Sequence, residues 1–450
     1  MSKPTRIVIL GGGFAGTGAA LRLERLFRRD DSVEIVLVDA ENFFVFTPLL
    51  PEVPSGSLQP KHIVFPHRAL LRKTKVRQAE IRAIDLDRRF VVASHCQMCG
   101  DFEQQFDHLV LAFGAVPNFF GLPGVAENAL TIKSLADATA LHAHVVDKLE
   151  HADLQDDSDL RRELLTFVVA GGGFAGVETI AELNDFVRAC GRYYPHVQPE
   201  EPRLVLVQSG QRILPEVSEK LSAYALRKLR QRGVEVVLEA RVKECTATEV
   251  RLSNGALIRT RTLVWSAGLA PCQILASVDL PKNAGKIQVE QTLQVKDRPG
   301  IWALGDCAAV PDLVPGKSCP PTAQHAIRQG RLIADNIAAA IKGTPPVAFH
   351  YKPLGLMAGL GRRSAVAEIL GFRFSGFVAW WLWRSIYLSK LPGWERKIRV
   401  ALDWTLDLFF PRDIVFLRPL YTAHGHQTAV DVRPEAAVVG APQAPSSRAT

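Results

Sequence analysis

Cysteine is scarce in this chain of 450 residues: there are seven, scattered between Cys96 and Cys319. The odd number and wide spacing do not suit a disulfide scaffold and favour free thiols in a reducing compartment. Cys96 and Cys99 form a CxxC pair, but a structural zinc site needs a second pair or suitably spaced histidines, and only His95 is adjacent. We therefore interpret the pair as two free thiols in a loop and expect no metal.

Long apolar runs are missing as well. Around the carboxyl-terminal tryptophans, the longest uncharged stretch, residues 374–383, is far short of the roughly twenty residues that a transmembrane helix needs. The first residues lead directly into a strand-like segment, without the features of an export signal. We expect a chain that faces the cytosol and does not span the membrane.

The overall composition is that of a globular protein. Hydrophobic residues make up 47% and charged residues 22%, which is sufficient for buried cores, and the length allows about three domains. The net charge of +8 favours an anionic partner such as nucleic acid, anionic lipid or a phosphate-bearing cofactor. Basic residues and aromatics cluster together only near the carboxyl end, so no nucleic-acid partner is expected.

The hexapeptide GGGFAG occurs twice, at residues 11–16 and 171–176. The first copy follows a β-branched run at 5–10 and precedes apolar residues at helical spacing, which predicts a strand, a tight turn and a helix. In this setting the first glycine permits the turn, the second lets the backbone approach a pyrophosphate, and the third allows close packing of the helix. Asp39 ends the next strand-like run, where a carboxylate binds the ribose of an adenosine.

The second copy repeats the layout, with an apolar run before it and another strand-like run at 203–207. Apolar segments that break at a glycine followed by a proline also recur, at 109–117 and 263–271. Two homologous halves, each binding one dinucleotide, are the simplest interpretation. The predicted fold class is α/β, with two Rossmann-like dinucleotide-binding domains and a carboxyl-terminal amphipathic membrane-binding region.

With these motifs the sequence resembles the type II NADH dehydrogenases, the non-pumping NADH:quinone oxidoreductases among the two-dinucleotide-binding flavoproteins. The resemblance covers about residues 5–420 and includes FTPLLPEV, NFFGLPGV, IWALGDCAAV, PPTAQHAIRQG and AWWLWRSIYL. It implies hydride transfer from NADH to FAD and then transfer of two electrons to a membrane quinone. Disulfide reductases of this fold need a cysteine pair soon after the first glycine motif, and sulfide:quinone oxidoreductases need a late thiol. The sequence has neither.

The resemblance implies that the first half binds FAD. Asp306 would meet the ribityl and phosphate side of the flavin, although the residue type alone also fits a helix N-cap. Ile81 is expected near the adenine. The full set of expected FAD contacts is Gly11, Gly13, Phe14, Ala15, Gly16, Asp39, Ile81, Asp306, Ala323 and Gln324.

The same resemblance places a quinone site beside the flavin. Gln324 and Gln329 are expected to border it, because amide groups can bond a quinone carbonyl; helix capping and surface solvation are the alternatives. For His325, packing beneath the flavin and proton transfer both remain open.

The nicotinamide nucleotide would bind in the second half, at Gly171, Gly173, Gly176 and Gln208. NADH-specific members of the family have a glutamate where this chain has Gln208, so the repulsion of a 2'-phosphate is missing, and Arg212 is near enough in sequence to hold one. NADH is the expected donor, since a glutamine can hydrogen-bond a ribose hydroxyl, but NADPH is left open.

Glu178 is the expected catalytic residue. It follows the second glycine motif where the first copy has Gly18, and the resemblance implies that it positions substrate or relays a proton. A first-turn acid that complements the helix dipole is the alternative.

The carboxyl-terminal segment is rich in tryptophan and basic residues, which prefer the bilayer interface and anionic headgroups. We expect peripheral binding to an anionic surface at the cytoplasmic face of the cell (inner) membrane; the core of a third domain or a homodimer interface is the alternative. The tryptophans are Trp380, Trp381, Trp383, Trp394 and Trp404.

The expected domains follow from these motifs. An FAD-binding domain at 1–115 and 285–345 encloses a nicotinamide-binding domain at 116–284, and a membrane-associating region follows at 346–420. Residues 421–450 are rich in Ala, Pro and Val without periodicity and are predicted to be a disordered tail. A flavin-binding sensor or interaction protein with little turnover remains the alternative function.

Overall fold

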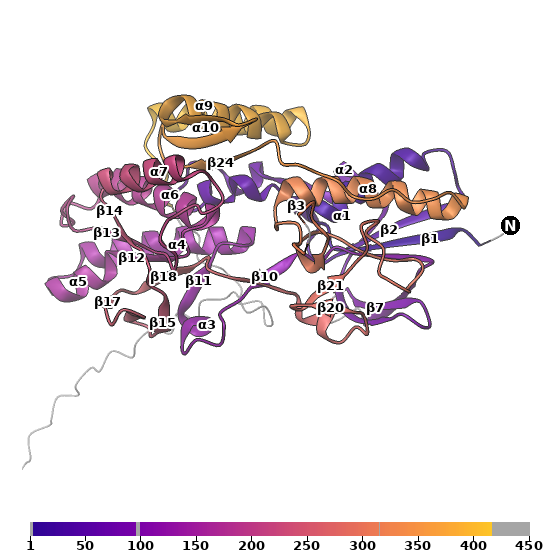
Figure 1. The fold of residues 1–450 in the computed structure, drawn as a ribbon. Coiled ribbons are helices and arrows are strands. Elements are labelled where there is room, and N and C mark those ends of the chain that lie inside the picture. Colours follow the sequence, from indigo (N-terminus) through magenta and orange to yellow (C-terminus); the bar gives the residue numbers. More distant parts are fainter. Residues whose placement is uncertain (1–2, 96–99, 315, 416–450) are drawn as a thin grey trace, which may run out of the picture. The chain divides into compact units, whose positions relative to one another are not determined.

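The structure, a computed structural model, describes residues 3–95, 100–314 and 316–415. The predicted tail at 421–450 and the CxxC segment at 96–99 lie outside these residues. In the described part, most of the parallel strands belong to two separate five-stranded sheets with helices packed around them (Figure 1). This arrangement is the predicted α/β fold with two Rossmann-like units.

The first parallel sheet has the strand order β22-β9-β1-β2-β5. Its central strand β1 is rich in β-branched residues and its last four residues are buried, as expected for a strand covered on both faces. Although β22 follows the whole second sheet in sequence, it pairs with β9 and completes the first sheet. The strands are β1 (Thr5–Leu10), β2 (Val33–Asp39), β5 (Lys75–Gln78), β9 (His108–Leu111) and β22 (Ile301–Ala303).

Two helices of the first unit, α1 (Phe14–Leu26) and α8 (Ala323–Lys342), pack side by side (Figure 1). Small residues allow this close approach: a Cβ added at Gly330 would clash with the carbonyl oxygen of Ala15. The contact places the start of α8 near the first glycine loop, although about 300 residues separate them in the chain.

The second parallel sheet has the order β11-β18-β12-β13-β14. The helix that follows its glycine loop, α6, has a largely apolar, buried face that packs on the sheet, while Ser134 and Asp137 form a capping box at the start of α4. The strands are β11 (Ala129–Thr131), β12 (Thr166–Ala170), β13 (Arg203–Val207), β14 (Val234–Val237) and β18 (Thr262–Trp265), and the helices are α4 (Leu135–Asp153), α5 (Ser158–Leu164), α6 (Phe174–Cys190) and α7 (Glu219–Gln231).

The chain passes between the two units through a pair of antiparallel strands, β10 (Ala115–Pro117) and β19 (Leu269–Pro271). β10 leads from the first sheet to the second, and β19 leads back. These strands are the ends of the two glycine–proline segments that recur in the sequence, so that repeat marks both connections between the units.

Smaller sheets and short helices complete the two units. The antiparallel strands are β3 (Phe43–Val45) and β4 (Val64–Pro66), then β6 (Glu80–Asp85), β7 (Phe90–Ser94) and β8 (Asp101–Gln105), and β15 (Val242–Cys245), β16 (Glu249–Leu252) and β17 (Leu257–Arg259); a mixed sheet holds β20 (Lys282–Asn283), β21 (Lys286–Gln288) and β23 (Ala308–Ala309). The short helices are α2 (His67–Leu70) and α3 (Val125–Asn128), with 3-10 turns η1 (Thr47–Glu52), η2 (Pro60–His62), η3 (Gly191–Tyr193), η4 (Gln273–Ala276) and η5 (Gly305–Cys307).

The carboxyl-terminal part is a three-stranded antiparallel sheet followed by two helices. Its sheet packs on α6 and α7, and α9 packs on the sheet; Figure 1 shows α9 and α10, in yellow, on top of these elements. The elements are β24 (Gly355–Gly359), β25 (Ala365–Ile369), β26 (Phe372–Ser375), α9 (Gly376–Lys390) and α10 (Trp394–Phe409).

The five tryptophans of this part divide between core and surface. Trp383 and Trp404 are buried, and their rings lie 6.2 Å apart between centroids. Trp381 and Trp394 are 57% and 75% exposed. Among the described residues, no helix is both long enough and apolar enough to pass through a bilayer.

Candidate functional site

The first glycine loop has the geometry that its sequence predicts. Gly11 has a φ of 103°, in the left-handed region that favours glycine, and a Cβ there would clash with the carbonyl oxygen of Ala112. A Cβ at Gly16 would clash with the carbonyl oxygen of Gly11. Around Gly13, in contrast, no atom of the described residues lies within 4 Å of an added Cβ. The backbone at Gly13 is therefore open to a ligand.

The second loop repeats these features. Gly171 has a φ of 111°, and a Cβ at Gly176 would clash with the carbonyl oxygen of Gly171. Gly173 again has no described atom within 4 Å of an added Cβ. The two copies of GGGFAG thus form the same turn, with the same position open, in both units.

A polar side chain at the end of the next strand holds each loop. The N-H of Gly12 donates to Asp39 Oδ2, and the N-H of Glu41 donates to Asp39 Oδ1 at 2.7 Å. In the second unit the N-H of Gly172 donates to Gln208 Oε1 at 2.9 Å. Burial raises the pKa of Asp39, and its backbone donors oppose that shift. Gln208 therefore takes the structural place of Asp39 without its charge.

The start of each glycine-loop helix suits a phosphate group. Neither α1 nor α6 has a side-chain cap or an acidic residue in its first turn, so its free N-H groups and the positive end of the helix dipole are not neutralised locally. Together with the open backbone at Gly13, this is the environment that a dinucleotide pyrophosphate requires. Both loops thus fit the pyrophosphate of a dinucleotide such as FAD or a nicotinamide nucleotide.

The other predicted FAD residues lie on several elements of the first unit. Asp306 lies in η5, directly after β22, with its Oδ2 atom 3.7 Å from Lys133 Nζ. Ile81 lies in β6 and packs partly buried against the core of the first sheet. Phe14, the first residue of α1, makes edge-to-face contact with Phe44, with 4.8 Å between ring centroids.

The residues predicted to border the quinone site lie on the first two turns of α8, after Ala323. Both ends of the Gln324 amide are engaged: Nε2 donates to the carbonyl oxygen of Gly355 at 2.9 Å, and Oε1 accepts from the Tyr351 hydroxyl at 2.8 Å. Gln329 is only 2% exposed, and its Oε1 accepts from the N-H of Gly305 at 2.8 Å. The structure therefore shows Gln329 as a link between α8 and η5.

His325 is buried beside these two glutamines. Its Nδ1 lies 2.7 Å from the Thr322 hydroxyl, and its ring makes edge-to-face contact with Tyr351. Burial lowers its pKa, which favours the neutral imidazole.

Glu178 lies beyond the first turn of α6, because it is the fifth residue of that helix. Its Oε1 accepts from the N-H of Gly359 at 2.8 Å and from Trp383 Nε1 at 3.2 Å. Burial raises the pKa of this carboxyl group to about 8, against the opposing effect of its two donors. These contacts with β24 and α9 argue against a role limited to the helix dipole.

Two further buried carboxyl groups line the same recess as Glu178. Glu52, at the end of η1, accepts from Trp404 Nε1 at 2.5 Å, and burial raises its pKa to about 7, with Arg384 opposing the shift. Glu182 lies one turn beyond Glu178 on α6, and burial raises its pKa against the effect of Arg412. The sequence analysis missed both; the spacing of Glu178 and Glu182 by four residues on an apolar helix was the available signal.

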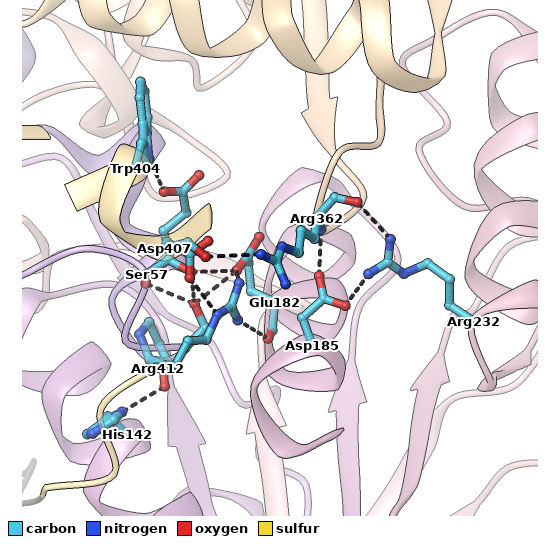
Figure 2. A network of polar contacts seen from close by, with 12 residues as sticks. Ser57, His142, Glu182, Asp185, Arg232, Arg362, Trp404, Asp407 and Arg412 are labelled. Atoms are coloured by element: carbon cyan, nitrogen blue, oxygen red, sulfur yellow. Dashed lines mark hydrogen bonds and ion pairs between the residues drawn. The ribbon is translucent and has the colours of Figure 1, made fainter. Parts of the chain in front are cut away.

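Charged groups tie α6 to the carboxyl-terminal part (Figure 2). Arg412 donates from Nη2 to Glu182 Oε2 at 3.3 Å and from Nε to Asp407 Oδ1 at 3.0 Å. On the next turn, Asp185 pairs with Arg232 and accepts from the N-H of Arg362 at 2.5 Å. The carboxyl-terminal helices are thus fixed over the helix that carries Glu178.

Two parallel sheets, each with an open glycine loop at the carboxyl end of a central strand, define an oxidoreductase that holds two dinucleotides. Comparison with known families agrees: residues 5–330 match the pyridine nucleotide-disulphide oxidoreductases, and residues 354–413 match the NDH2 C-terminal domain.

Known relatives show to which family of oxidoreductases this chain belongs. A probable NADH dehydrogenase of Dictyostelium discoideum is 34% identical over 417 residues, covering 91% of this chain and 90% of that protein. The type II NADH:quinone oxidoreductase Ndh of Mycobacterium tuberculosis is 32% identical over 90% of this chain and 89% of its own length. The chain therefore belongs to the type II NADH dehydrogenases, within the pyridine nucleotide-disulphide oxidoreductases.

The fold agrees with solved structures. NDH2 from Plasmodium falciparum in complex with NADH superposes with a TM-score of 0.85 at 21% identity, covering 92% of this chain and all of that one. The sulfide:quinone oxidoreductase of Aquifex aeolicus superposes less closely, with a TM-score of 0.68 at 18% identity over 90% of this chain and 95% of that one. These likenesses confirm the predicted fold.

Proposed function

We propose that this protein is a type II NADH:quinone oxidoreductase, which oxidises NADH and reduces a quinone to the quinol through FAD without pumping protons. The observation that carries this proposal is the pair of equivalent open glycine loops in a chain whose residues 354–413 match the NDH2 C-terminal domain. One hydride and one proton enter for each quinone, since NADH, a proton and quinone give NAD⁺ and quinol.

The first unit holds FAD, which supplies the acceptor for hydride and the donor of two electrons. The backbone around Gly13 and the start of α1 would bind the pyrophosphate, and Asp39 the ribose of the adenosine. We also propose that FAD contacts Ile81, Asp306, Ala323 and Gln324.

In the second unit, Gly173 and the start of α6 would bind the pyrophosphate of NADH. Gln208 already accepts from the loop with its oxygen, while its Nε2 donates to the carbonyl oxygen of Arg212 at 3.2 Å. Arg212 donates from Nη2 to the carbonyl oxygen of Pro215 at 2.7 Å, so part of its guanidinium is engaged in its own loop. These contacts support NADH as the donor, with NADPH the second candidate because Gln208 carries no charge.

Glu178 is the proposed proton-holding residue. A buried carboxyl group with a pKa of about 8 is mostly protonated at neutral pH, so it can give a proton to a reduced quinone and recover it afterwards. Its hydrogen bonds to Gly359 and Trp383 fix its position. Of the two glutamines, we propose that Gln324 borders the quinone and that Gln329 positions η5.

The carboxyl-terminal helices support peripheral attachment to a membrane. Large apolar side chains on α9 and α10 are exposed, and basic residues accompany them, a combination that favours the interface of an anionic bilayer. We propose that they attach the enzyme to the cytoplasmic face of the inner membrane; a homodimer contact is the competing use of the same face. The exposed residues include Phe377, Val378, Trp381, Trp394, Ile398, Leu402, Leu406 and Phe409.

The domain division is part of the same proposal. The pairing of β22 with β9 supports a discontinuous FAD-binding domain at 1–115 and 285–345 around a nicotinamide-binding domain at 116–284, with 346–420 as the membrane-associating region.

Purified protein tests the function directly. The enzyme should carry bound FAD, and NADH should bleach its flavin absorbance, which a short-chain quinone should restore. A flavin that NADH reduces but quinone does not reoxidise would instead support the flavin-binding sensor.

A further inference from the structure

His67 is a buried histidine that lies against the first glycine loop. It is the first residue of α2, and its side chain is 0% exposed. The chain reaches it from the β3–β4 hairpin, and the N-H of His67 donates to the carbonyl oxygen of Asn42 at 2.9 Å. No motif in the sequence predicts a role for this residue.

The ring of His67 and the carboxyl group of Asp39 meet at Gly12. A Cβ added at Gly12 would lie 2.4 Å from both Cε1 and Nε2 of His67 and 3.0 Å from Asp39 Oδ2. The N-H of Gly12 itself donates to Asp39 Oδ2. One edge of the imidazole, the carboxyl group and the backbone of the loop therefore come together at this glycine.

Neither ring nitrogen of His67 has a hydrogen-bond partner among the described residues. A neutral imidazole has one N-H donor and one acceptor nitrogen, and a buried polar atom without a partner is both costly and uncommon. Burial lowers the pKa of His67 to about 4, which keeps the ring neutral at neutral pH. In the part of the chain that the structure describes, one N-H donor is thus buried beside Asp39 without an acceptor.

Asp39 can accept a further hydrogen bond. Its Oδ1 accepts from the N-H of Glu41 and its Oδ2 from the N-H of Gly12, but each carboxylate oxygen has two lone pairs. Burial raises the pKa of Asp39, and a donor from His67 would oppose that shift by stabilising the charged form. The charged carboxylate is the form that accepts from both hydroxyls of a ribose.

We propose that His67 is a positioning residue for FAD: its Nε2-H donates to Asp39 Oδ2 and holds the carboxylate in the orientation that accepts the hydroxyls of the adenosine ribose. Because His67 has no exposed surface even without the cofactor, it acts through Asp39 and does not touch FAD itself. The inference rests on the proposed binding of FAD by the first unit, and it adds a residue that sets the affinity for the cofactor.

Equilibrium dialysis of the full-length protein against FAD measures the effect. His67→Leu has a similar volume but no donor, and it should weaken FAD binding by about tenfold or more, since hydrogen bonds to charged groups are among the stronger ones in proteins. His67→Gln keeps an N-H donor and should bind FAD within about threefold of the wild-type affinity. A role limited to packing would not produce this difference between the two variants.

A double-mutant cycle tests whether His67 acts through Asp39. In an Asp39→Ala protein, which lacks the acceptor, His67→Leu should change the dissociation constant of FAD less than about twofold. If Asp39→Ala binds too little FAD for a dissociation constant, the comparison of His67→Leu with His67→Gln decides.

His144→Leu is the matched control. Burial also lowers the pKa of His144 to about 4, but this histidine lies on α4 of the second unit, with its Nε2 2.9 Å from Thr262 Oγ1. Its replacement should lower Tm and change the affinity for FAD less than about twofold, because the two sites are independent.

Three results would overturn the proposal. Equal FAD affinity of His67→Leu and the wild type would mean that the imidazole only packs against Gly12. Equally weak binding by His67→Leu and His67→Gln would mean that the shape of the ring matters and not its N-H. An undiminished effect of His67→Leu in the Asp39→Ala protein would mean that His67 does not act through Asp39. A wild type that binds no FAD would instead contradict the proposed function itself.

Discussion

The indole Nε1 of Trp383 donates to the carboxyl Oε1 of Glu178 at 3.2 Å, and the two residues lie 205 positions apart in the sequence. This bond joins α6, the helix of the second glycine loop, to α9, the first helix of the proposed membrane-binding part. The residue that we propose to hold the proton is therefore fixed by the segment that we propose to meet the quinone-bearing membrane.

Glu178→Gln should remain folded and keep FAD, but its kcat with a short-chain quinone should fall by about a hundredfold or more, the usual range for loss of a general acid. Stopped-flow measurement should show that NADH still reduces the flavin, so that only reoxidation slows. Glu127→Gln, at an exposed position, is the control. Unchanged kinetics with both substrates would mean that Glu178 has only a structural role.

Trp383→Phe should shift the pH dependence of quinone reduction to higher pH. The indole donor stabilises the charged carboxylate and so lowers the pKa of Glu178; its removal should raise that pKa further. The measurement is kcat between pH 6 and 10. If the pH profile of kcat does not shift while Tm falls, the indole contributes to packing and not to the pKa of Glu178.

Buried carboxyl groups should make the protein less stable at alkaline pH. Burial raises the pKa of Glu178 to about 8 and of Glu52 to about 7, from an ordinary value of 4.5. Their contribution is fully present below about pH 4.5 and is lost as the pH rises through these raised values, because the folded state then has to ionise a buried group.

Urea denaturation at pH 6 and pH 9 measures this effect. The wild type should lose a few kcal/mol of unfolding free energy over that interval, since one pKa unit corresponds to about 1.4 kcal/mol, and Glu178→Gln should lose less. An equal loss in both proteins would mean that Glu178 does not titrate in this range.

Arg412→Leu should destabilise the docking of the carboxyl-terminal helices by about 3–5 kcal/mol, because it leaves Glu182 and Asp407 buried without their partner. The Tm of the FAD-loaded enzyme measures it. Arg373→Leu, at an exposed position, should leave Tm almost unchanged, and similar values for the two variants would show that the ion pairs do not hold these helices.

Gln208→Glu should make the enzyme more selective for NADH. A carboxylate at the end of β13 would repel the 2'-phosphate of NADPH, so kcat/KM with NADPH should fall at least about tenfold while that with NADH changes little. A wild type that prefers NADPH by tenfold or more would overturn our assignment of the donor.

Local patterns were sufficient to predict the two nucleotide-binding units. The sequence around Gly11 and Gly171 determines the turn within a few residues, because only glycine tolerates those backbone angles and close contacts. The spacing from there to Asp39 and Gln208 also follows from one strand–helix–strand unit.

The carboxyl cluster could not be predicted in the same way. Glu52, Glu178 and Glu182 come from η1 and α6, and their partners Trp404, Trp383 and Arg412 come from the end of the chain. Apart from the four-residue spacing of Glu178 and Glu182 on α6, no short-range spacing relates these residues. Only the packing of the carboxyl-terminal helices brings the carboxyl groups and their partners together. The position of each tryptophan could not be predicted from the sequence either. The composition of the segment indicated a membrane interface, whereas the fold places two of the five tryptophans in the core.

Anaerobic titration of the purified enzyme tests the central claim most directly. One equivalent of NADH per flavin should bleach the FAD absorbance, and one equivalent of a short-chain quinone should restore it within the turnover time. A protein that binds no flavin, or whose flavin NADH reduces and quinone fails to reoxidise, would contradict the assignment as an NADH:quinone oxidoreductase.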